Sequence, residues 1–386
     1  MASKGLEGRS VLCFGHDWSG DPLSKTHIMR LIARKNRVLW INSIGYRKPT
    51  ASARDMRRVV DKLKKFTERV REVEPNIFVL GPLAIPAYDS PVIQRLNREL
   101  LRLQIKAAMK KLHMERPISF VFNPTGSVVT GSLGEDKVVY YCVDEFTAYS
   151  DAGTTGLVAL EEKLLARADL VVVSAESLRK TKSKYNPRIA LVRHGVQFDH
   201  FRKALDPATK IPDDVAGLPK PVIGYFGLMA DDWIDIDLLD AIAQRFKEGT
   251  LVLLGKVTTD MSKVTRHANV KLLGRKRFED LPAYAKAFDV ALNAFPINDV
   301  TLNANPLKVR EYLAAGLPVV SSRIPEVEVL GDQVHIADDQ QGFLDAIAVA
   351  LKDPGPKLER SETMRDESWA GRYAELEKHL EAHGIV

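Results

Sequence analysis

Short apolar runs alternate with longer amphipathic stretches along the first half of the chain. The apolar runs indicate strands at 9–15, 37–43, 76–82, 118–123, 137–144 and 170–175. The amphipathic stretches predict helices at about 24–35, 52–74, 91–113 and 155–168. Because each strand is apolar throughout and does not alternate, we expect a parallel sheet covered by helices on both faces.

The stretch 202–220 interrupts this rhythm, since it is rich in Pro, Asp and Lys and poor in large apolar residues. Beyond it the pattern restarts, with strands expected at 221–227, 250–256, 269–274, 289–295, 318–322 and 334–337. Helices are expected at 236–246, 278–288, 306–315 and 340–352. We therefore predict an α/β protein with two Rossmann-like, doubly wound domains facing across a cleft. The expected parts are a first domain 1–201, a linker 202–220, a second domain 221–365 and a C-terminal helix 366–386 that packs back on the first domain.

The 386 residues have the apolar content, 45%, and charged content, 27%, of soluble globular proteins. No run of about 18 apolar residues occurs, so we expect no membrane span. The apolar run after residue 10 is too short for a signal peptide, which predicts a cytoplasmic protein. Cys13 and Cys142 lie in predicted strands, where a buried free thiol is usually inert.

Charge is unevenly distributed, because residues 1–115 carry 23 Lys+Arg against 11 Asp+Glu while the remainder is net acidic. The predicted helices 52–74 and 91–113 are basic and amphipathic, so they suit an anionic membrane face. The protein would then work at the inner face of the membrane, as a peripheral protein. Alternatively, the two helices cover the first sheet and expose solvated Lys and Arg side chains. No motif indicates a nucleic-acid partner.

The segment 303–320 carries the most specific chemical signal. Asn305 is a good N-cap, Pro306 suits the first helical position, and Gly316 fits just past the helix end, so a short helix is predicted at 306–315. Its N-terminus offers unpaired N–H groups and a positive dipole, which suit a phosphate. Lys308 adds a positive charge in the first turn.

Glu311 follows Lys308 by three residues, so both side chains project from one side of this helix. A carboxylate there can accept two hydrogen bonds from a ribose diol. The alternative is an ordinary i,i+3 Lys–Glu pair on a solvated helix face.

The sequence of 306–320, P-x-K-x-x-E-Y-L-A-x-G-x-P-V-V, resembles the donor-site helix of GT-B-fold glycosyltransferases, especially the bacterial family 4 type, glycosyl transferases group 1. Further resemblances keep their order along the chain and lie at 140–146, 166–178, 193–201, 223–227 and 269–295. The first third of the chain fits by architecture only.

The resemblance implies a nucleotide-sugar-dependent hexosyltransferase that uses a UDP- or GDP-linked donor, needs no metal or other cofactor, and retains the anomeric configuration. The acceptor would be a glycan or a lipid-linked sugar, in bacterial surface polysaccharide synthesis. Glu311 would bind the ribose, while Lys308 and the backbone N–H of Leu307 would bind the diphosphate. Gly227 would let the backbone approach the donor, and Lys276 would lie beside the base.

The resemblance makes the first domain, 1–201, the acceptor-side domain and the second, 221–365, the donor domain. Two departures from the family pattern occur in this donor domain. Asn303 takes the place of a glutamate that touches the donor sugar, and the stretch 227–237 lacks the usual Arg and Lys. The phosphate charge then falls to Lys308 and to other basic side chains, namely Arg275, Arg193, Lys256 and Arg323. The same stretch has four acidic residues, Asp231, Asp232, Asp235 and Asp237. We expect these to begin a helix; Mg²⁺ or Mn²⁺ binding is the alternative.

The acceptor-side chemistry is expected at the carboxyl end of strand 137–144, where Asp144 and then Glu145 are the candidate catalytic residues. The loop after the first strand carries Asp17, Trp18 and His27, which would border the acceptor. The alternative for this loop is an ordinary surface turn with Ser24 as the cap of the following helix.

Two other functions stay open. A GT-B-fold sugar-nucleotide epimerase binds the same donor without an acceptor, and a non-catalytic nucleotide-sugar-binding protein would fit the departures just described. A dinucleotide-dependent dehydrogenase is disfavoured, because no G-x-G-x-x-G follows the first strand of either predicted domain.

Overall fold

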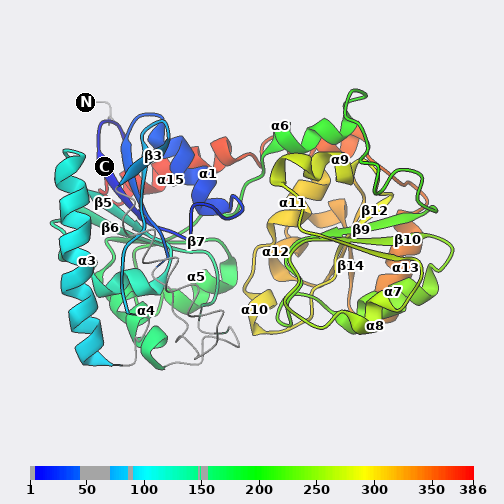
Figure 1. Cartoon of the computed structure of the whole chain (residues 1–386), viewed down its shortest axis with the longest axis horizontal. Coiled ribbons are helices and arrows are strands. Elements are labelled where there is room, and N and C mark those ends of the chain that lie inside the picture. The colour runs from blue at the N-terminus through cyan, green and yellow to red at the C-terminus, as the bar shows by residue number, and fades with distance from the viewer. Residues whose placement is uncertain (1–4, 44–69, 86–89, 147, 149–154) are drawn as a thin grey trace. The chain divides into compact units, whose positions relative to one another are not determined.

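The computed structural model describes residues 5–43, 70–85, 90–146, 148 and 155–386. The chain divides into two compact units, and each is a layered α/β structure (Figure 1). Unit 1 comprises residues 1–193 and 373–386, and unit 2 comprises residues 194–372. The two runs of apolar strands found in the sequence therefore correspond to two separate sheets.

The described residues of unit 1 form an eight-stranded sheet in the order β3-β4-β2-β1-β5-β6-β7-β8. Neighbouring strands are parallel except β3 and β4, which are antiparallel. The strands are β1 (Ser10–Phe14), β2 (Arg37–Ile41), β3 (Arg71–Glu74), β4 (Ile77–Leu80), β5 (Ile118–Val121), β6 (Lys137–Cys142), β7 (Leu170–Val173) and β8 (Ile189–Leu191). β3 corrects the predicted helix 52–74, whose last four residues pair with β4; the rest, up to residue 69, lies outside the described residues.

Helices pack on this sheet through apolar side chains that are buried between the two layers. The helical elements of unit 1 are α1 (Ser24–Ala33), α3 (Pro91–Lys111), η1 (Pro124–Val128), α4 (Thr155–Arg167), α5 (Glu176–Lys182) and the part of α15 (Trp369–Ala382) that begins at Tyr373. Cys13 and Cys142 are buried free thiols in β1 and β6. None of the described helices combines the length and the apolar content that crossing a membrane requires.

Unit 2 contains a parallel sheet of six strands, all within the described residues, in the order β11-β10-β9-β12-β13-β14. The strands are β9 (Val222–Phe226), β10 (Thr250–Leu254), β11 (Val270–Gly274), β12 (Val290–Asn293), β13 (Val319–Ser322) and β14 (Val334–Ala337). Successive side chains alternate between the two faces, so Phe226 enters one apolar core and Tyr225 the other.

Helices cover both faces of this second sheet (Figure 1). Residues of α9 (Leu281–Ala285) and α11 (Leu307–Ala314) belong to the core that contains Phe226, and residues of α7 (Ile236–Arg245), α8 (Ser262–Thr265) and α13 (Gln340–Ala350) belong to the other. The remaining short elements are α6 (Phe198–Phe201), η3 (Arg202–Leu205), η4 (Phe278–Asp280), α10 (Asp299–Leu302), α12 (Pro325–Glu328), η5 (Gly331–Gln333) and α14 (Leu358–Glu362).

The stretch 202–220, predicted to be a linker, belongs to unit 2, and the units divide between Arg193 and His194. Its polar groups bind lysines elsewhere in unit 2. Lys286 Nζ donates to the carbonyl oxygens of Asp206 and Thr209, at 2.6 and 2.8 Å. These bonds attach a segment with few apolar residues to the surface of unit 2.

Candidate functional site

Helix α11 begins one residue later than the sequence predicts, with Pro306 at the N-cap. The expected cap, Asn305, is buried, and its side-chain oxygen accepts a hydrogen bond of 2.7 Å from Arg310 Nη1. Arg310 is itself buried and also donates to Glu367 at 3.2 Å. The Asn305 amide oxygen is therefore used by a buried guanidinium, and it does not cap the helix.

The helix end follows the prediction. Gly316 has a φ of +83°, and a Cβ there would lie 2.5 Å from the Lys357 carbonyl oxygen, so only glycine fits. In the first turn, the backbone N–H groups of Leu307 and Lys308 have no acceptor among the residues that the structure describes. They are available to an anion, and Leu307 is the residue whose N–H is predicted to bind the diphosphate.

Lys308 is half-buried and lies between two aromatic rings. Its Nζ is 4.3 Å from the centre of the Tyr225 ring and 4.4 Å from that of Phe295. It also donates a hydrogen bond of 2.8 Å to the Tyr225 hydroxyl, which in turn donates to the Leu228 carbonyl at 2.9 Å. Burial lowers the pKa of Lys308 to about 7, although Glu311 opposes this.

Glu311 is half-buried one turn further along α11. Within the described ranges, its carboxylate forms neither a hydrogen bond nor an ion pair. Burial raises the pKa of Glu311 to about 8, against the opposing effect of Lys308. Both groups therefore change charge near neutral pH, and a bound anion beside Lys308 would favour the charged form of its ammonium.

Glycines occupy the carboxyl ends of the neighbouring strands β9 and β10 in unit 2. Gly227 follows β9 with a φ of +148°, and Gly255 follows β10 with a φ of +142°. Their backbones are in direct contact, since a Cβ on Gly255 would lie 1.8 Å from the Gly227 carbonyl oxygen. A Cβ on Gly227 would lie 2.8 Å from Lys308 Nζ. Gly227 thus leaves room for the lysine, and Gly255, which sequence reasoning missed, leaves room for Gly227.

Two predicted donor residues are engaged within unit 2. The Asn303 amide nitrogen donates to the Asp299 carbonyl at 2.7 Å, at the end of α10. Lys276 forms an ion pair of 2.7 Å with Asp214, which also accepts from the Tyr284 hydroxyl at 3.0 Å. These bonds raise the pKa of Lys276, the Asp214 bond above all. Of the other predicted basic residues, Arg275 is exposed and Arg193 half-buried.

The acidic stretch 227–237 starts helix α7, as predicted. The Asp235 side chain caps this helix by accepting from the Leu238 N–H at 2.9 Å. Asp237 pairs with Lys263 of α8 at 2.6 Å, and Asp231 accepts a hydrogen bond from the Thr259 hydroxyl. These three carboxylates are therefore engaged in hydrogen bonds and an ion pair around α7 and α8.

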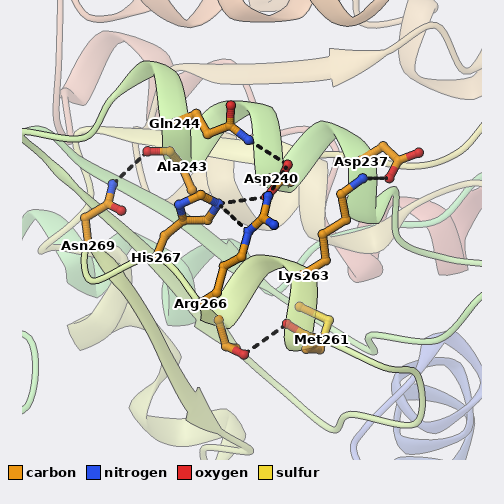
Figure 2. A network of polar contacts seen from close by, with 10 residues as sticks. Asp237, Asp240, Ala243, Gln244, Met261, Lys263, Arg266, His267 and Asn269 are labelled. Atoms are coloured by element: carbon orange, nitrogen blue, oxygen red, sulfur yellow. Dashed lines mark hydrogen bonds and ion pairs between the residues drawn. The ribbon is translucent and has the colours of Figure 1, made fainter.

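Figure 2 shows the network that joins these two helices. Buried Asp240 of α7 lies 2.7 Å from His267 Nε2 and 3.0 Å from Arg266 Nη2, just after α8. The hydrogen bond from His267 lowers the pKa of Asp240. The Arg266 charge lowers it further, whereas desolvation opposes both effects. The acidic residues of α7 therefore stabilise the packing of α8. Among the described residues, no group of three or more His, Cys, Asp or Glu is arranged to hold a metal ion.

In unit 1 the two predicted catalytic carboxylates follow β6. Glu145 forms an ion pair of 2.7 Å with Lys182. Asp144 is half-buried, and its charge acts on Lys25 in the first turn of α1. Burial lowers the pKa of Lys25, and Asp144 opposes this decrease. The fold therefore brings Asp144 near a cation that sequence reasoning missed.

His16 is a second neighbour of Lys25. Burial, and then the Lys25 charge, lower the pKa of His16 to about 4, so its imidazole is neutral at pH 7. Both residues were overlooked because no spacing rule connects the loop after β1 with the end of β6. One signal was present: Lys25, like Lys308, lies in the first turn of a helix that follows a strand.

The predicted acceptor-side residues of the first loop have different environments. Asp17 is exposed, and His27 is buried in α1. The Trp18 ring packs edge-on against Trp40, with centroids 5.0 Å apart, and the Arg30 guanidinium lies 5.7 Å from it. Helix α1 begins at Ser24, so Ser24 is not its cap.

Comparisons with known proteins agree with this architecture. Residues 220–353 match the family model for glycosyl transferases group 1. The "Putative teichuronic acid biosynthesis glycosyltransferase TuaH" of Bacillus subtilis (strain 168) is 24% identical over 209 residues, which are 49% of this chain and 51% of that protein. The match thus spans about half the length of this relative.

Two solved structures resemble the whole chain. Sucrose-phosphate synthase from Thermosynechococcus elongatus has a TM-score of 0.69 at 16% identity, covering 98% of this chain and 99% of its own. Anabaena Alr3699/HepE in complex with UDP has a TM-score of 0.63 at 13% identity, covering 97% and 100%. At these identities the likeness shows the fold, and the predicted GT-B class, with two Rossmann-like domains, is confirmed.

Proposed function

Because residues 220–353 match the family model for glycosyl transferases group 1, we propose that this protein transfers a hexosyl group from a nucleotide sugar to an acceptor hydroxyl. The observation that carries the proposal is the pair formed by Lys308 and Glu311 on α11. Both side chains are half-buried, and each changes the pKa of the other. The half-burial of both side chains favours this interpretation over the alternative of a pair on a solvated helix face.

The pair divides the work of holding a nucleoside diphosphate. Lys308 donates one of its three N–H groups to Tyr225, which leaves two for phosphate oxygens. The N–H groups of the first turn of α11 add the positive end of the helix dipole. As the sugar leaves, negative charge grows on the diphosphate, and these fixed donors stabilise it. Glu311, once deprotonated, accepts hydrogen bonds from the ribose hydroxyls.

The donor in this proposal is UDP- or GDP-linked. The titles of two similar structures describe one protein, Anabaena Alr3699/HepE, with UDP and with UDP and glucose. A third similar structure is a UDP-forming trehalose-phosphate synthase from Burkholderia vietnamiensis. UDP is therefore the nucleotide to test first. Lys308 supplies the charge beside the diphosphate, so the proposal requires no divalent metal, and transfer should persist in EDTA.

The acceptor is a glycan or a lipid-linked sugar, and the setting is bacterial surface polysaccharide synthesis. The name of the Bacillus subtilis relative, with its reference to teichuronic acid, supports this setting. We assign to Asp144 the role of taking the acceptor proton, and its position just after the carboxyl end of β6 supports this role. Transfer with retention of configuration is part of the proposal, so the acceptor must attack the sugar on the face from which the diphosphate leaves; NMR of the product tests this.

A cytoplasmic location at the inner membrane face completes the proposal. Helix α3 exposes 77% of Val92, 54% of Leu96 and 63% of Leu103. The same helix carries six basic residues and one acidic residue. Apolar side chains flanked by Lys and Arg match the interfacial region of an anionic bilayer.

A panel of UDP-, GDP-, ADP- and TDP-sugars in a thermal-shift assay tests the donor proposal. A specific donor raises the melting temperature by mass action, and Glu311→Ala should reduce the rise. If no nucleotide sugar stabilises the wild type, the proposal is wrong. Product analysis with the donor alone then separates the remaining functions. Hydrolysis supports a transferase, an epimerised sugar supports an epimerase, and an unchanged donor in the presence of many acceptors supports a binding protein.

A further inference from the structure

A buried ion network in unit 1 surrounds Lys182, the last residue of α5. Its Nζ lies 2.7 Å from Glu145 Oε1 and 3.0 Å from Glu161 Oε2. The three side chains are only 6%, 13% and 4% exposed, in the order Lys182, Glu145, Glu161. The Tyr140 hydroxyl donates to the other oxygen of Glu161 at 2.7 Å. One cation is thus shared by two carboxylates that are largely shielded from solvent.

Burial of such a network destabilises the fold unless every charge is compensated. The free-energy cost of removing the ions from water can exceed the gain from a single ion pair. Burial acts to lower the pKa of Lys182, but the two carboxylates, Glu161 first, raise it above its ordinary value. Lys182 therefore stays charged across the whole physiological range. A permanent charge of this kind suits a fixed anchor and does not suit a proton carrier.

The network ends at the turn that carries Asp144, and that turn is held at three successive residues. The Ser174 hydroxyl donates to the Val143 carbonyl at 2.9 Å. The Cys142 thiol lies 3.3 Å from the Asp144 carbonyl oxygen. The third contact is the ion pair between Lys182 and the Glu145 side chain. Both bonds to the backbone come from strand ends, whereas the ion pairs of Lys182 connect the turn to helices α4 and α5.

We propose that Lys182 is a positioning residue, which fixes Glu145 and thereby sets the position of Asp144 for proton transfer from the acceptor. This inference rests on the proposed function. It gives the two neighbouring carboxylates different tasks: Glu145 is the anchor and Asp144 is the reacting group. Glu161 of α4 also binds Lys182, and the Tyr140 hydroxyl of β6 in turn donates a hydrogen bond to Glu161.

Kinetics of transfer by the full-length protein test this assignment. Lys182→Met should lower kcat for transfer by about 100-fold, since a displacement of about 1 Å has that effect on a reacting group. The dissociation constant of the nucleotide sugar should not change, because donor binding lies in unit 2. Lys182→Arg should restore most of the rate. Lys180→Met, on the exposed face of the same helix, is the control and should match the wild type.

A second comparison separates positioning from a general loss of structure. If Lys182 acts through Glu145, the double variant Lys182→Met/Glu145→Gln should be no slower than Lys182→Met alone. Should Lys182→Met fail to fold, Lys182→Met/Glu161→Gln keeps the net charge of the network and takes its place. Glu145→Gln alone should also slow transfer, by about 10-fold.

Two results would overturn the assignment. One is a folded Lys182→Met, or its charge-balanced replacement, that transfers as fast as Lys180→Met. The other is a strictly additive double variant, which would give Lys182 and Glu145 independent roles. A failure of the proposed function looks different, because the wild type itself would then neither bind a nucleotide sugar in calorimetry nor transfer.

Discussion

The Lys308 ammonium donates a hydrogen bond of 2.8 Å to the Tyr225 hydroxyl, while its charge also lies 4.3 Å from the centre of the same ring. One aromatic side chain at the end of β9 therefore both orients the ammonium and partly compensates its charge. This arrangement keeps the lysine beside Gly227, with two N–H groups left for a ligand.

We expect both charged residues of α11 to be needed for donor binding. Glu311→Ala and Lys308→Met each remove hydrogen bonds to a charged group, which are worth about 1.5 to 3 kcal/mol, so the dissociation constant should rise about 10- to 100-fold. Isothermal titration calorimetry with UDP measures this. Exposed Glu248→Ala and Lys247→Met serve as matched controls on unit 2, and an unchanged affinity in Glu311→Ala would contradict the ribose role.

Stability without ligand should depend on pH through Glu311. Its pKa is raised from an ordinary 4.5 to about 8 in the folded protein, so between these values the folded state binds more protons than the unfolded state. The free energy of unfolding should therefore fall as pH rises from 5 to 8. Each tenfold change in proton affinity corresponds to about 1.4 kcal/mol.

The matched variant is Glu311→Gln, which keeps the shape of the side chain but does not titrate. Relative to this variant, the wild type should lose at least about 1.4 kcal/mol between pH 5 and pH 8. Urea unfolding at both pH values measures the difference. Parallel curves for the two proteins would show that the carboxyl group is not desolvated in the folded state.

Gly227→Ala should weaken donor binding by displacing the lysine. The new methyl group would lie 2.8 Å from Lys308 Nζ, at a backbone φ of +148° that costs a side chain about 1 to 2 kcal/mol. Gly217→Ala is the control, because Gly217 also has a positive φ, +71°, but its Cβ would meet nothing within 4 Å. A thermal melt measures the strain that both variants share, and UDP affinity measures what is specific to Gly227. Equal UDP affinities in the two variants would argue against a steric role.

Asp144→Asn should stop transfer and spare donor binding. An amide cannot take a proton, and the loss of a general base typically costs about 100- to 10,000-fold in rate. Transfer assays with a lipid-linked acceptor measure the rate, and calorimetry measures UDP binding. Glu162→Gln, on an exposed face of α4, is the control in the same unit. Retention of the wild-type rate in Asp144→Asn would move the base elsewhere.

Membrane binding should depend on the exposed leucines of α3. Leu96→Ser/Leu103→Ser removes apolar surface from its outer face and should reduce sedimentation with phosphatidylglycerol vesicles about 10-fold or more. Vesicles of phosphatidylcholine alone should bind weakly, because the helix is basic. Leu358→Ser in unit 2 removes an equally exposed leucine and should have no effect. Equal binding of all three proteins would exclude α3 as the contact.

Much of the fold could be predicted from the sequence, because its signals are local. Continuous apolar runs predicted two parallel sheets, and the Pro306 and Gly316 signals predicted α11 to within one residue at each end. The same local reasoning failed at Asn305, whose side chain binds Arg310 and does not cap the helix. It also failed at residues 71–74, where a basic amphipathic pattern concealed the strand β3.

The sequence by itself determined that Lys308 and Glu311 share one side of a short helix, since residues three positions apart are neighbours on the surface of a helix. Only the tertiary structure decided that Lys308 meets Tyr225, 83 residues earlier in the chain, and that Glu145 meets Lys182, 37 residues later. Helical period and caps are properties of neighbouring residues, so they can be read along the chain. Desolvation and long-range pairing depend on which strands lie side by side, and that order exists only in the folded sheet.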